Sequence, residues 1–329
     1  MTRGLLELID RFPRARVAVF GDLIVDEFIY GDIERVSREA PVLILKYDST
    51  QIVPGGAGNA ANNVAALGGR AMPIGFAGSD ETGRRLVATM RRTMDVRGIV
   101  KPPAYRTPTK TRILAGGIHS AKQQVVRIDR ASKLHVAPRD LKAIEGRLFA
   151  AASRCDALLV SDYGSGLVTP ALVRAVQKRF KGPVLVDSRY QLIRFRRMTG
   201  CTPNESEVEQ LFGAKIGDNK RVLERCGRLL LDITHAKAVL ITRGSRGMAL
   251  FEPKQPTVHI PIFGSDQIAD VTGAGDTVMA AMTLALAAGG SFEQAARLAN
   301  YAGGLVVMKR GTATVSAAEL RQAVSSDHG

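Results

Sequence analysis

The chain of 329 residues contains no tryptophan, few aromatic residues (5%) and three cysteines. The shortage of aromatic rings leaves few side chains on which nucleic-acid bases could stack. Cys155, Cys201 and Cys226 are odd in number and lack the spacing of metal ligands. We therefore predict free thiols in a reducing compartment rather than a disulfide-linked secreted fold or a cysteine metal site.

Long apolar runs are also missing from the sequence. No uninterrupted apolar stretch reaches the roughly 18 residues that a membrane-spanning helix requires. The first residues, 1–6, lack the long apolar core of a signal peptide. We therefore expect a cytoplasmic protein with no membrane partner.

Long blocks of like charge are absent, although the net charge is +15, from 46 basic and 31 acidic residues. The basic residues occur in short clusters, such as Arg91-Arg92 and residues 194–197, and not in the long blocks of a nucleic-acid-binding tail. We interpret the charge as an attraction for small anionic molecules. A hydrophobic content of 45% supports a substantial core, and the length suits one large α/β domain.

Short apolar runs alternate with helical segments along most of the chain. This alternation predicts a layered α/β fold with a mainly parallel central sheet. Buried strands are expected at residues 16–20, 157–160, 184–186 and 238–242. Helices are expected at residues 57–67 and 81–94, from Thr169-Pro170 to near Gly182, and after the capping boxes that begin at Ser291 and Ser316.

Two segments, residues 30–52 and 105–129, interrupt this alternation. Each contains apolar runs with no convincing helix between them, which predicts inserted antiparallel strands. The strands could form a small sheet that serves as a lid over a substrate or as a dimer surface, or they could form two edge hairpins of the main sheet. The pattern alone leaves both arrangements open.

The stretch from Asp270 to Thr277 carries the strongest chemical signal. Gly273 and Gly275, on either side of Ala274, allow a tight turn whose N–H groups can point into one space. The N-terminus of a following helix would add further donors, and such a nest suits a phosphoryl group. Asp276 could then accept the proton of an attacking hydroxyl. The alternative is a glycine-rich turn in which Asp276 is an ordinary first-turn acid.

Four more motifs occur in a fixed order before this stretch: residues 21–26, 55–59, 202–207 and 242–247. Together with the Asp270–Thr277 stretch, they make the chain resemble the ribokinase-like, or PfkB-type, family of carbohydrate kinases from about Arg16 to Leu320. The resemblance implies one ribokinase-like domain over residues 1–329, with three layers, a mainly parallel central sheet and a small β-sheet lid. It also implies ATP-dependent transfer of a phosphoryl group to a sugar hydroxyl, and a homodimer that forms through the lid strands.

The resemblance implies a role for each matching residue on the nucleotide side. Asp276 would be the general base, and the N–H groups of Gly273, Ala274 and Gly275 would stabilise the transferring phosphoryl group. The residues expected near ATP and Mg²⁺ are Asn204 and Glu207 for Mg²⁺ and its waters, Thr242, Gly244 and Gly247 for the phosphates and ribose, and Asn300 near the base. Asp270 and Thr272 match positions that hold a monovalent cation in some relatives, for which K⁺ is the candidate. The usual P-loop mechanism is excluded because the sequence has no Walker motif with its lysine.

On the sugar side, the resemblance implies hydrogen bonds from sugar hydroxyls to acids at the end of the first strand. The expected substrate-binding residues are Asp22, Asp26, Gly55, Gly56 and Asn59, together with Lys110, Arg112 and Arg127 from the lid strands. Arginine suits a phosphate through its planar, two-pronged set of donors. The alternative for each of the three cations is a solvated charge on a strand face.

Within the family, the chain looks most like the kinases that phosphorylate D-glycero-D-manno-heptose 7-phosphate at the anomeric hydroxyl to give the 1,7-bisphosphate. The stretches that carry this likeness are residues 36–42, 109–112, 123–129 and 159–164. In many bacteria such a kinase is fused to a nucleotidyltransferase domain. Because this chain ends at Gly329, we expect the kinase part alone.

The chain also departs from the heptose-kinase pattern. Asp162-Tyr163-Gly164-Ser165-Gly166 stands where those enzymes usually have Asp-Tyr-x-Lys-Gly, and Asp187-Ser188-Arg189 stands where they have Asp-Pro-Lys. Arg130 and Ala131 replace the usual aromatic residue and acid. The alternatives are therefore another sugar kinase of this fold, acting on ribose, fructose or a keto-sugar acid, and more remotely a basic, non-catalytic nucleic-acid-binding protein.

Binding to DNA or RNA is predicted to be weak and to disappear near physiological salt. A protein that neutralises several phosphates loses affinity steeply with salt, roughly in proportion to the number of contacts. Fluorescence anisotropy with labelled oligonucleotides, from about 50 to about 200 mM salt, would measure this loss. Tight binding at the upper end, with a clear sequence preference, would contradict the prediction and support the nucleic-acid-binding alternative.

Overall fold

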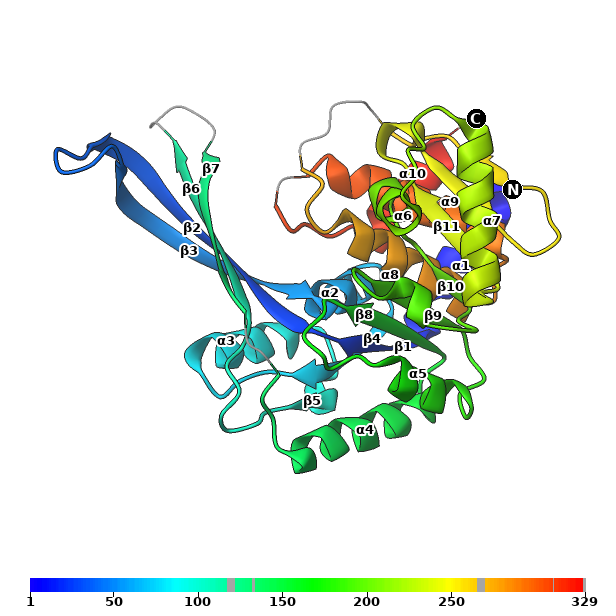
Figure 1. The fold of residues 1–329 in the computed structure, drawn as a ribbon, viewed down its shortest axis with the longest axis horizontal. Helices are drawn as coiled ribbons and strands as arrows, with labels where there is room; N and C mark the ends of the chain where they lie inside the picture. The colour runs from blue at the N-terminus through cyan, green and yellow to red at the C-terminus, as the bar shows by residue number, and fades with distance from the viewer. Residues whose placement is uncertain (117–121, 132–133, 265–269, 310, 328–329) are drawn as a thin grey trace.

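A nine-stranded sheet runs through the body of the protein (Figure 1). The computed structural model describes residues 1–116, 122–131, 134–264, 270–309 and 311–327. In spatial order the strands are β13 (Val258–Ile260), β12 (Met248–Phe251), β11 (Ala238–Thr242), β10 (Gly200–Cys201), β9 (Val184–Ser188), β8 (Ala157–Asp162), β1 (Arg16–Gly21), β4 (Arg70–Phe76) and β5 (Ile99–Val100). All neighbours from β11 to β5 pair in parallel, and β12 and β13 pair antiparallel at one edge. The predicted mainly parallel sheet is confirmed.

Helices cover both faces of this sheet and form three layers (Figure 1). One face is covered by α1 (Thr2–Ile9), α2 (Ala57–Ala66), α3 (Glu81–Met90), α8 (Ala274–Ala287), α9 (Phe292–Val307) and α10 (Ala317–Ser326). The other is covered by α4 (Pro138–Ala152), α5 (Pro170–Gln177), α6 (Glu205–Phe212) and α7 (Lys220–Thr234). Short 3₁₀ helices lie between these elements: η1 (Phe12–Arg14), η2 (Val96–Gly98), η3 (Leu192–Arg194) and η4 (Gly244–Arg246).

Strand β1 shows why the sequence produces two cores. Successive side chains of a strand point to opposite faces of the sheet. Val17 and Val19 belong to the core under α2 and α8, whereas Ala18 and Phe20 belong to the core under α4. In a strand buried on both faces, every side chain lies in a core, so the strand appears in the sequence as a continuous apolar run.

A second sheet of four strands projects from the three-layered body (Figure 1). Its order is β3 (Leu43–Gly56), β2 (Leu23–Val36), β6 (Thr109–Gly116) and β7 (Gln123–Arg130). The inserted strands are therefore a separate sheet and not edge hairpins of the main one. They were expected to be antiparallel throughout, but β2 and β6 pair in parallel, because these two strands come from different insertions. Residues 117–121 of the second predicted segment lie outside the described residues.

Two helices end earlier than their patterns predicted. Helix α3 stops at Met90 and not at Met94, since Thr93 N donates to Met90 O across a tight turn. Helix α5 stops at Gln177, and Arg179 N and Phe180 N both donate to Val176 O. Such closing turns are common at helix ends, where the last carbonyl groups lack partners within the helix.

Other expectations about the chain agree with the structure. The three cysteines are free thiols. Capping boxes at Ser291 and Ser316 start α9 and α10. Among the described residues, no helix has both the length and the apolar character needed to cross a membrane.

Candidate active site

The candidate site lies where the parallel strands of the main sheet end. Asp22 follows β1, Tyr163 follows β8, and Thr202 follows β10. In open α/β sheets, ligands bind outside the carboxyl ends of the strands, because the loops of several strands meet there. Residues that are far apart in the sequence are therefore brought to one edge of the sheet, opposite the N-terminus of α8.

The glycine-rich stretch forms the start of α8, as predicted. Gly273 is the N-cap and has a φ of 78°, and a Cβ atom there would come within 2.6 Å of Asn59 Nδ2. Glycine is therefore required for both its backbone angle and its lack of a side chain. Ala274 and Gly275 line a cavity, although Ala274 N donates to Val271 O in this structure. The first turn of α8 thus presents its N-terminal end to that cavity.

Asp276 is buried in the first turn of α8. Its carboxylate is 5% exposed and accepts a hydrogen bond from Asn59 Nδ2 at 2.7 Å. The hydroxyl of Tyr163 lies 3.4 Å from Asp276 Oδ1. Asn63 orients Asn59 by donating to its backbone oxygen at 3.0 Å, and Thr277 donates to Asn63 at 2.8 Å. These bonds hold the carboxylate in one position, and among the residues that the structure describes no cation forms an ion pair with it.

Burial raises the pKa of Asp276 to about 7, and the nearby charge of Asp26 adds to the rise. The hydrogen bonds from Asn59 and Tyr163 and the charge of Lys110 act in the opposite direction. A carboxyl group with a pKa near neutrality is a stronger proton acceptor than an ordinary aspartate, and it is still deprotonated in much of the population. Asp276 can therefore act as a general base.

A cavity of about 340 Å³ lies on one side of Asp276. It collects the residues that the motifs placed near a nucleotide: Asn204, Glu207, Thr242, Gly244, Gly247, Ala274, Gly275 and Asn300. The remainder of its wall includes apolar side chains, among them Met248, Ile262 and Val278, which suit the face of a flat ring. Sequence motifs from four separate regions thus meet in one cavity.

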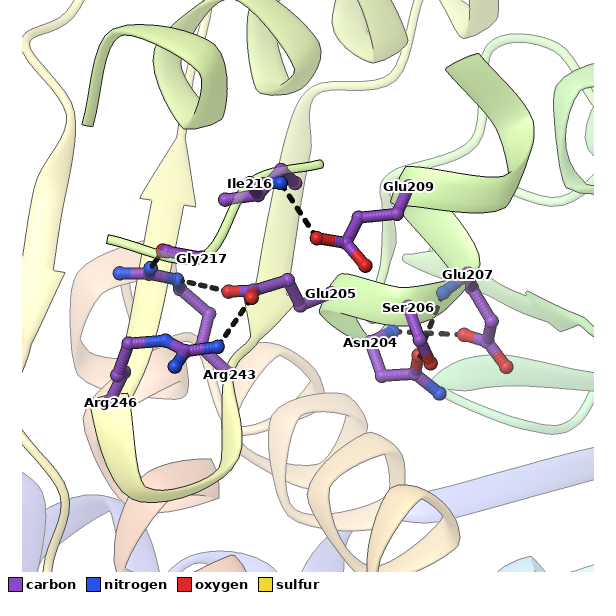
Figure 2. Close-up of polar contacts among 9 residues, drawn as sticks. All are labelled: Asn204, Glu205, Ser206, Glu207, Glu209, Ile216, Gly217, Arg243 and Arg246. Carbon is purple, nitrogen blue, oxygen red and sulfur yellow. Dashed lines mark hydrogen bonds and ion pairs between the residues drawn. The ribbon is translucent and has the colours of Figure 1, made fainter. Parts of the chain in front are cut away.

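The start of α6 supplies the polar end of this cavity (Figure 2). Asn204 is the N-cap, and its side chain accepts from Glu207 N at 2.8 Å. Glu207 Oε2 in turn accepts from Asn204 N at 2.9 Å, which completes a capping box. The spacing of the Asn-x-x-Glu motif therefore has a local structural cause as well as a chemical use.

Asp187 is a candidate residue to which the sequence analysis gave no role. It follows the apolar run of β9 and lines the same cavity as Glu207. Burial raises its pKa to about 8, and the charges of Asp276 and Glu207 raise it further. Burial also raises the pKa of Glu207. The position of Asp187 at the carboxyl end of a parallel strand was the signal that could have identified it.

These two carboxylates fit a divalent cation. Asp187 and Glu207 repel one another, and a cation between or beside them would favour the charged form of both. Carboxylate oxygens are the ligands that Mg²⁺ prefers, with several of its waters retained. The donor set of the cavity therefore agrees with the expected metal.

A second cavity, of about 480 Å³, lies toward the four-stranded sheet. Of the predicted substrate residues, Asp22, Lys110 and Arg127 line it. Two cations to which the sequence analysis gave no role, Arg130 and Arg189, line it as well. Tyr163 is also in its wall and touches Asp276, so the proton acceptor lies within reach of both cavities.

The other predicted sugar-side residues lie behind this wall. Arg112 Nη1 donates to Asp26 Oδ1 at 2.6 Å, and both side chains are largely buried. Gly55 packs against Asp26, since a Cβ atom there would come within 2.5 Å of its Oδ2. Gly56, with a φ of 56°, is the N-cap of α2, the helix that carries Asn59. Arg112 thus contacts a protein carboxylate and is not among the residues that line the cavity.

Asp22 is tied to the loop that follows β8. Its Oδ2 accepts from Tyr163 N at 2.8 Å, and the hydroxyl of Ser165 contacts its Oδ1. Burial raises the pKa of Asp22, while these hydrogen bonds lower it. Ser165, which stands where the heptose kinases usually have lysine, therefore fixes the Asp22 carboxylate through a neutral contact.

The candidate monovalent-cation residues lie beside the start of α8. Asp270 Oδ1 accepts from Thr272 N at 2.8 Å, and its Oδ2 accepts from Gly311 N at 3.0 Å. Thr312 Oγ1 is a buried oxygen with no hydrogen-bond partner among the described residues. Unpaired oxygen in a buried place is a suitable ligand for a hard cation.

Comparison with known proteins gives a consistent result. The sequence model of a family described as "pfkB family carbohydrate kinase" matches residues 14–319. The bifunctional protein HldE of Geobacter sulfurreducens is 42% identical over 316 residues, which is 94% of this chain and 63% of that protein. HldE of Caulobacter vibrioides is 40% identical over 345 residues, 100% of this chain and 67% of that protein. The chain thus spans about two thirds of these relatives.

Solved structures share the fold at low sequence identity. Phosphofructokinase-2 from Escherichia coli in complex with potassium has a TM-score of 0.76 and 21% identity, covering 94% of this chain and 98% of that one. Ribokinase from Arabidopsis thaliana, complexed with ribose and ATP, has a TM-score of 0.70 and 19% identity, with the same coverage. The predicted ribokinase-like fold is confirmed.

Replacement of Asp276 by asparagine is expected to lower kcat by roughly 10²- to 10⁴-fold, because the amide keeps the shape but cannot take a proton. Nucleotide affinity should hardly change. In the wild type, kcat/KM should rise with pH through about 7, since the raised pKa leaves the base protonated below that pH. Steady-state kinetics from acid to alkaline pH would measure both effects.

Thermal unfolding provides the control for this variant. The pKa of Asp276 is raised from 3.8 to about 7 in the folded state. The carboxyl group therefore lowers the stability of the folded state progressively from about pH 4 to about pH 7 and fully above pH 7, and it has no such effect below about pH 4. Asp276→Asn should therefore be at least as stable as the wild type above pH 7. Near-normal turnover of the variant would remove Asp276 from the role of base, whereas a loss of stability would make a low kcat uninformative.

Proposed function

Because this chain belongs to the pfkB family of carbohydrate kinases, we propose that it transfers the γ-phosphoryl group of ATP to the anomeric hydroxyl of D-glycero-D-manno-heptose 7-phosphate. The product would be the 1,7-bisphosphate. The motifs of residues 36–42, 109–112, 123–129 and 159–164 support this acceptor. The observation that carries the proposal is the charge of the cavity toward the four-stranded sheet.

That cavity holds more cations than anions. Its wall contains Lys110, Arg127, Arg130 and Arg189, set against the carboxylates of Asp22 and Asp129. Arg127 already pairs with Asp129 at 2.9 Å. Arg130 Nη1 lies 3.8 Å from Glu27 Oε2. The charges of Lys110 and Arg189 then face only the carboxylate of Asp22 in this wall, which favours an acceptor that carries a phosphate, because a neutral pentose would add no anion. The phosphate would hold the sugar so that its far end reaches Asp276, and this remote binding energy would help to position the reacting hydroxyl.

The chemistry we propose uses few groups. The Asp276 carboxylate accepts the proton of the sugar hydroxyl while the oxygen of that hydroxyl attacks the γ-phosphorus of ATP and ADP leaves. The first turn of α8, at Gly273, Ala274 and Gly275, stabilises the negative charge on the transferring group. Asn59 keeps the carboxylate pointed at the hydroxyl, and Tyr163 closes the space beside it. ADP and the phosphorylated sugar leave from the two cavities.

Two cations complete the proposal. Mg²⁺ would be held near Asn204, Glu207 and Asp187, where it would neutralise charge on the triphosphate. A monovalent cation, K⁺, would lie near Asp270 and Thr272, where Thr312 Oγ1 is an unpaired buried oxygen. Its role would be to hold the turn before α8.

We further propose that two copies of the chain associate through the four-stranded sheet. Every residue of β7 is exposed, and Ile33, Val36, Leu43 and Tyr47 of β2 and β3 are exposed as well. A projecting sheet with this much exposed apolar surface is costly for a monomer and is typical of an association surface. A second copy would also bury the edge strands.

Light scattering coupled to size exclusion would test this association. Val126 and Ile128 are two residues apart in β7 and therefore share one face of the sheet. The Val126→Lys, Ile128→Lys double variant should elute as a monomer, while the wild type elutes as a dimer. Leu229→Lys on α7, also an exposed apolar position, is the matched control and should stay dimeric. A wild type that is monomeric at micromolar concentration would reject the proposal.

Heptose 7-phosphate is expected to be used far better than ribose or fructose in an assay of ADP release. Arg127→Ala should raise KM for the sugar phosphate by roughly ten- to a hundredfold, the usual loss for a hydrogen bond to a charged group. KM for ATP should change less. Arg112→Ala should also raise KM for the sugar, since it leaves Asp26 without its cation.

The matched control is Arg16→Ala, which removes an exposed arginine that pairs with Asp156 at the other end of β1. It should leave both KM values unchanged. A preference for an unphosphorylated sugar, together with an unchanged KM in Arg127→Ala and Arg112→Ala, would reject the heptose phosphate. The chain would still be a carbohydrate kinase.

A further inference from the structure

A cluster of one carboxylate and two guanidinium groups lies next to residues of the candidate nucleotide cavity, and its Glu205 and Arg243 side chains are largely buried. Figure 2 shows the cluster. Glu205, the first residue of α6, is 8% exposed. Its Oε2 accepts from Arg243 Nε at 2.7 Å, and its Oε1 contacts Arg246 Nη2. We call these three residues the Glu205 clamp. A largely buried carboxylate needs charged partners, and both of its partners here come from one turn, that of residues 242–247.

Arg243 connects three segments of the chain. Its side chain is 9% exposed, and its Nη2 donates to Gly217 O at 2.6 Å. The guanidinium therefore joins the start of α6, the turn of residues 242–247 and the connection between α6 and α7 (Figure 2). Glu209 holds the same connection by accepting from Ile216 N at 2.6 Å.

The residues next to the clamp line the nucleotide cavity. Asn204 precedes Glu205 and Glu207 lies two residues after it, and Thr242 and Gly244 flank Arg243. The clamp thus connects the two loops that would meet the triphosphate. The backbone bridge between Asn204 and Thr242 is the other direct connection between them among the described residues.

The turn of residues 242–247 contains two glycines, Gly244 and Gly247, with φ angles of 56° and 73°. Glycine at these positions gives the unfolded chain many other conformations. Within the turn, η4 and a hydrogen bond from Arg243 N to Gly247 O at 2.9 Å close the loop. The contacts to Glu205 add a connection from this loop to α6.

We propose that Glu205 and Arg243 are positioning residues for the nucleotide: they set the distance between the residues near the metal and the loop near the phosphates. Neither side chain is expected to touch ATP. The proposal rests on the assignment of ATP to this cavity. Misplacement of catalytic groups by about 1 Å can cost around 10²-fold in rate, so a rigid contact at this point has a large effect.

The first test is the conservative variant Glu205→Gln, which keeps the size of the side chain and removes its charge. KM for ATP is expected to rise roughly tenfold or more, because a hydrogen bond to a charged group is lost. KM for the sugar should stay within about twofold. The matched control is Glu224→Gln on α7. Glu224 Oε1 lies 2.8 Å from Arg228 Nε, and neither residue lines the cavity, so this variant should leave both KM values unchanged.

Two further measurements separate positioning from general stability. Binding of adenosine, which lacks phosphates, should be the same in Glu205→Gln and the wild type, while ATP binding weakens. Arg243→Lys keeps the charge but loses the fork that reaches Glu205 and Gly217, and it should show the same selective loss. The Glu205→Gln, Arg243→Gln double variant should be no worse than the poorer single variant, since both changes break one unit.

The outcomes are distinct. An equal loss of ATP and adenosine binding, or equal rises in the two KM values, would overturn the positioning role. Additive effects in the double variant would show that the two residues act separately, which would also overturn it. If the wild type binds ATP but mutation of Asn204 and Thr242 has no effect on that binding, the assignment of the cavity fails, independently of the clamp.

Discussion

The carboxylate of Asp276 is buried against the start of α8 and held by a 2.7 Å hydrogen bond from Asn59 Nδ2. A buried carboxylate is costly, and its raised pKa is the direct sign of that cost. Asp276 follows Gly275, which lines one cavity, and contacts Tyr163, which lines the other. Much of the surrounding structure follows from the need to hold it: Gly273 leaves room for Asn59, and Asn63 orients the amide. The hydrogen bonds to this carboxylate come from the neutral groups of Asn59 and Tyr163, which agrees with the proposed role of Asp276 as a proton acceptor.

The parallel sheet explains how distant residues reach this point. The carboxyl ends of its strands meet at one edge, where loops from β1, β8, β9, β10 and β11 each contribute a polar side chain. Strand β2 begins at Leu23, directly after Asp22, so the four-stranded sheet is joined to the main sheet at the candidate site. A movement of that sheet would therefore change the wall of the sugar-side cavity directly. The nucleotide side, in contrast, is built on α6, α8 and the β11–β12 turn.

The strongly basic composition has two structural uses. Some arginines face the sugar-side cavity, where they outnumber the acids. Others are used inside the protein: Arg112 pairs with Asp26, and Arg243 pairs with Glu205. Buried pairs of this kind add little net stability, since desolvation offsets the attraction, but the loss of one partner is expensive. Their value here is geometric, because each joins segments that border a cavity.

The sequence alone determined the fold class, and it predicted most of the residues that meet in the nucleotide-side cavity, because these features are encoded locally. Buried strands appear as apolar runs, and the turn before α8 needs glycine at fixed positions. The tertiary structure decided which cations line the cavity toward the four-stranded sheet. Lys110, Arg112 and Arg127 share the same alternating strand pattern, yet only contact with Asp26 separates Arg112 from the other two. The sequence signal for Asp187 was its place at the end of an apolar run, but the burial and the nearby carboxylates that raise its pKa arise only when the strands are side by side. The place of Arg189 in the other cavity wall likewise depends on the fold. The sequence shows which residues are charged, but only the folded chain shows whether a charged side chain faces a cavity or another side chain.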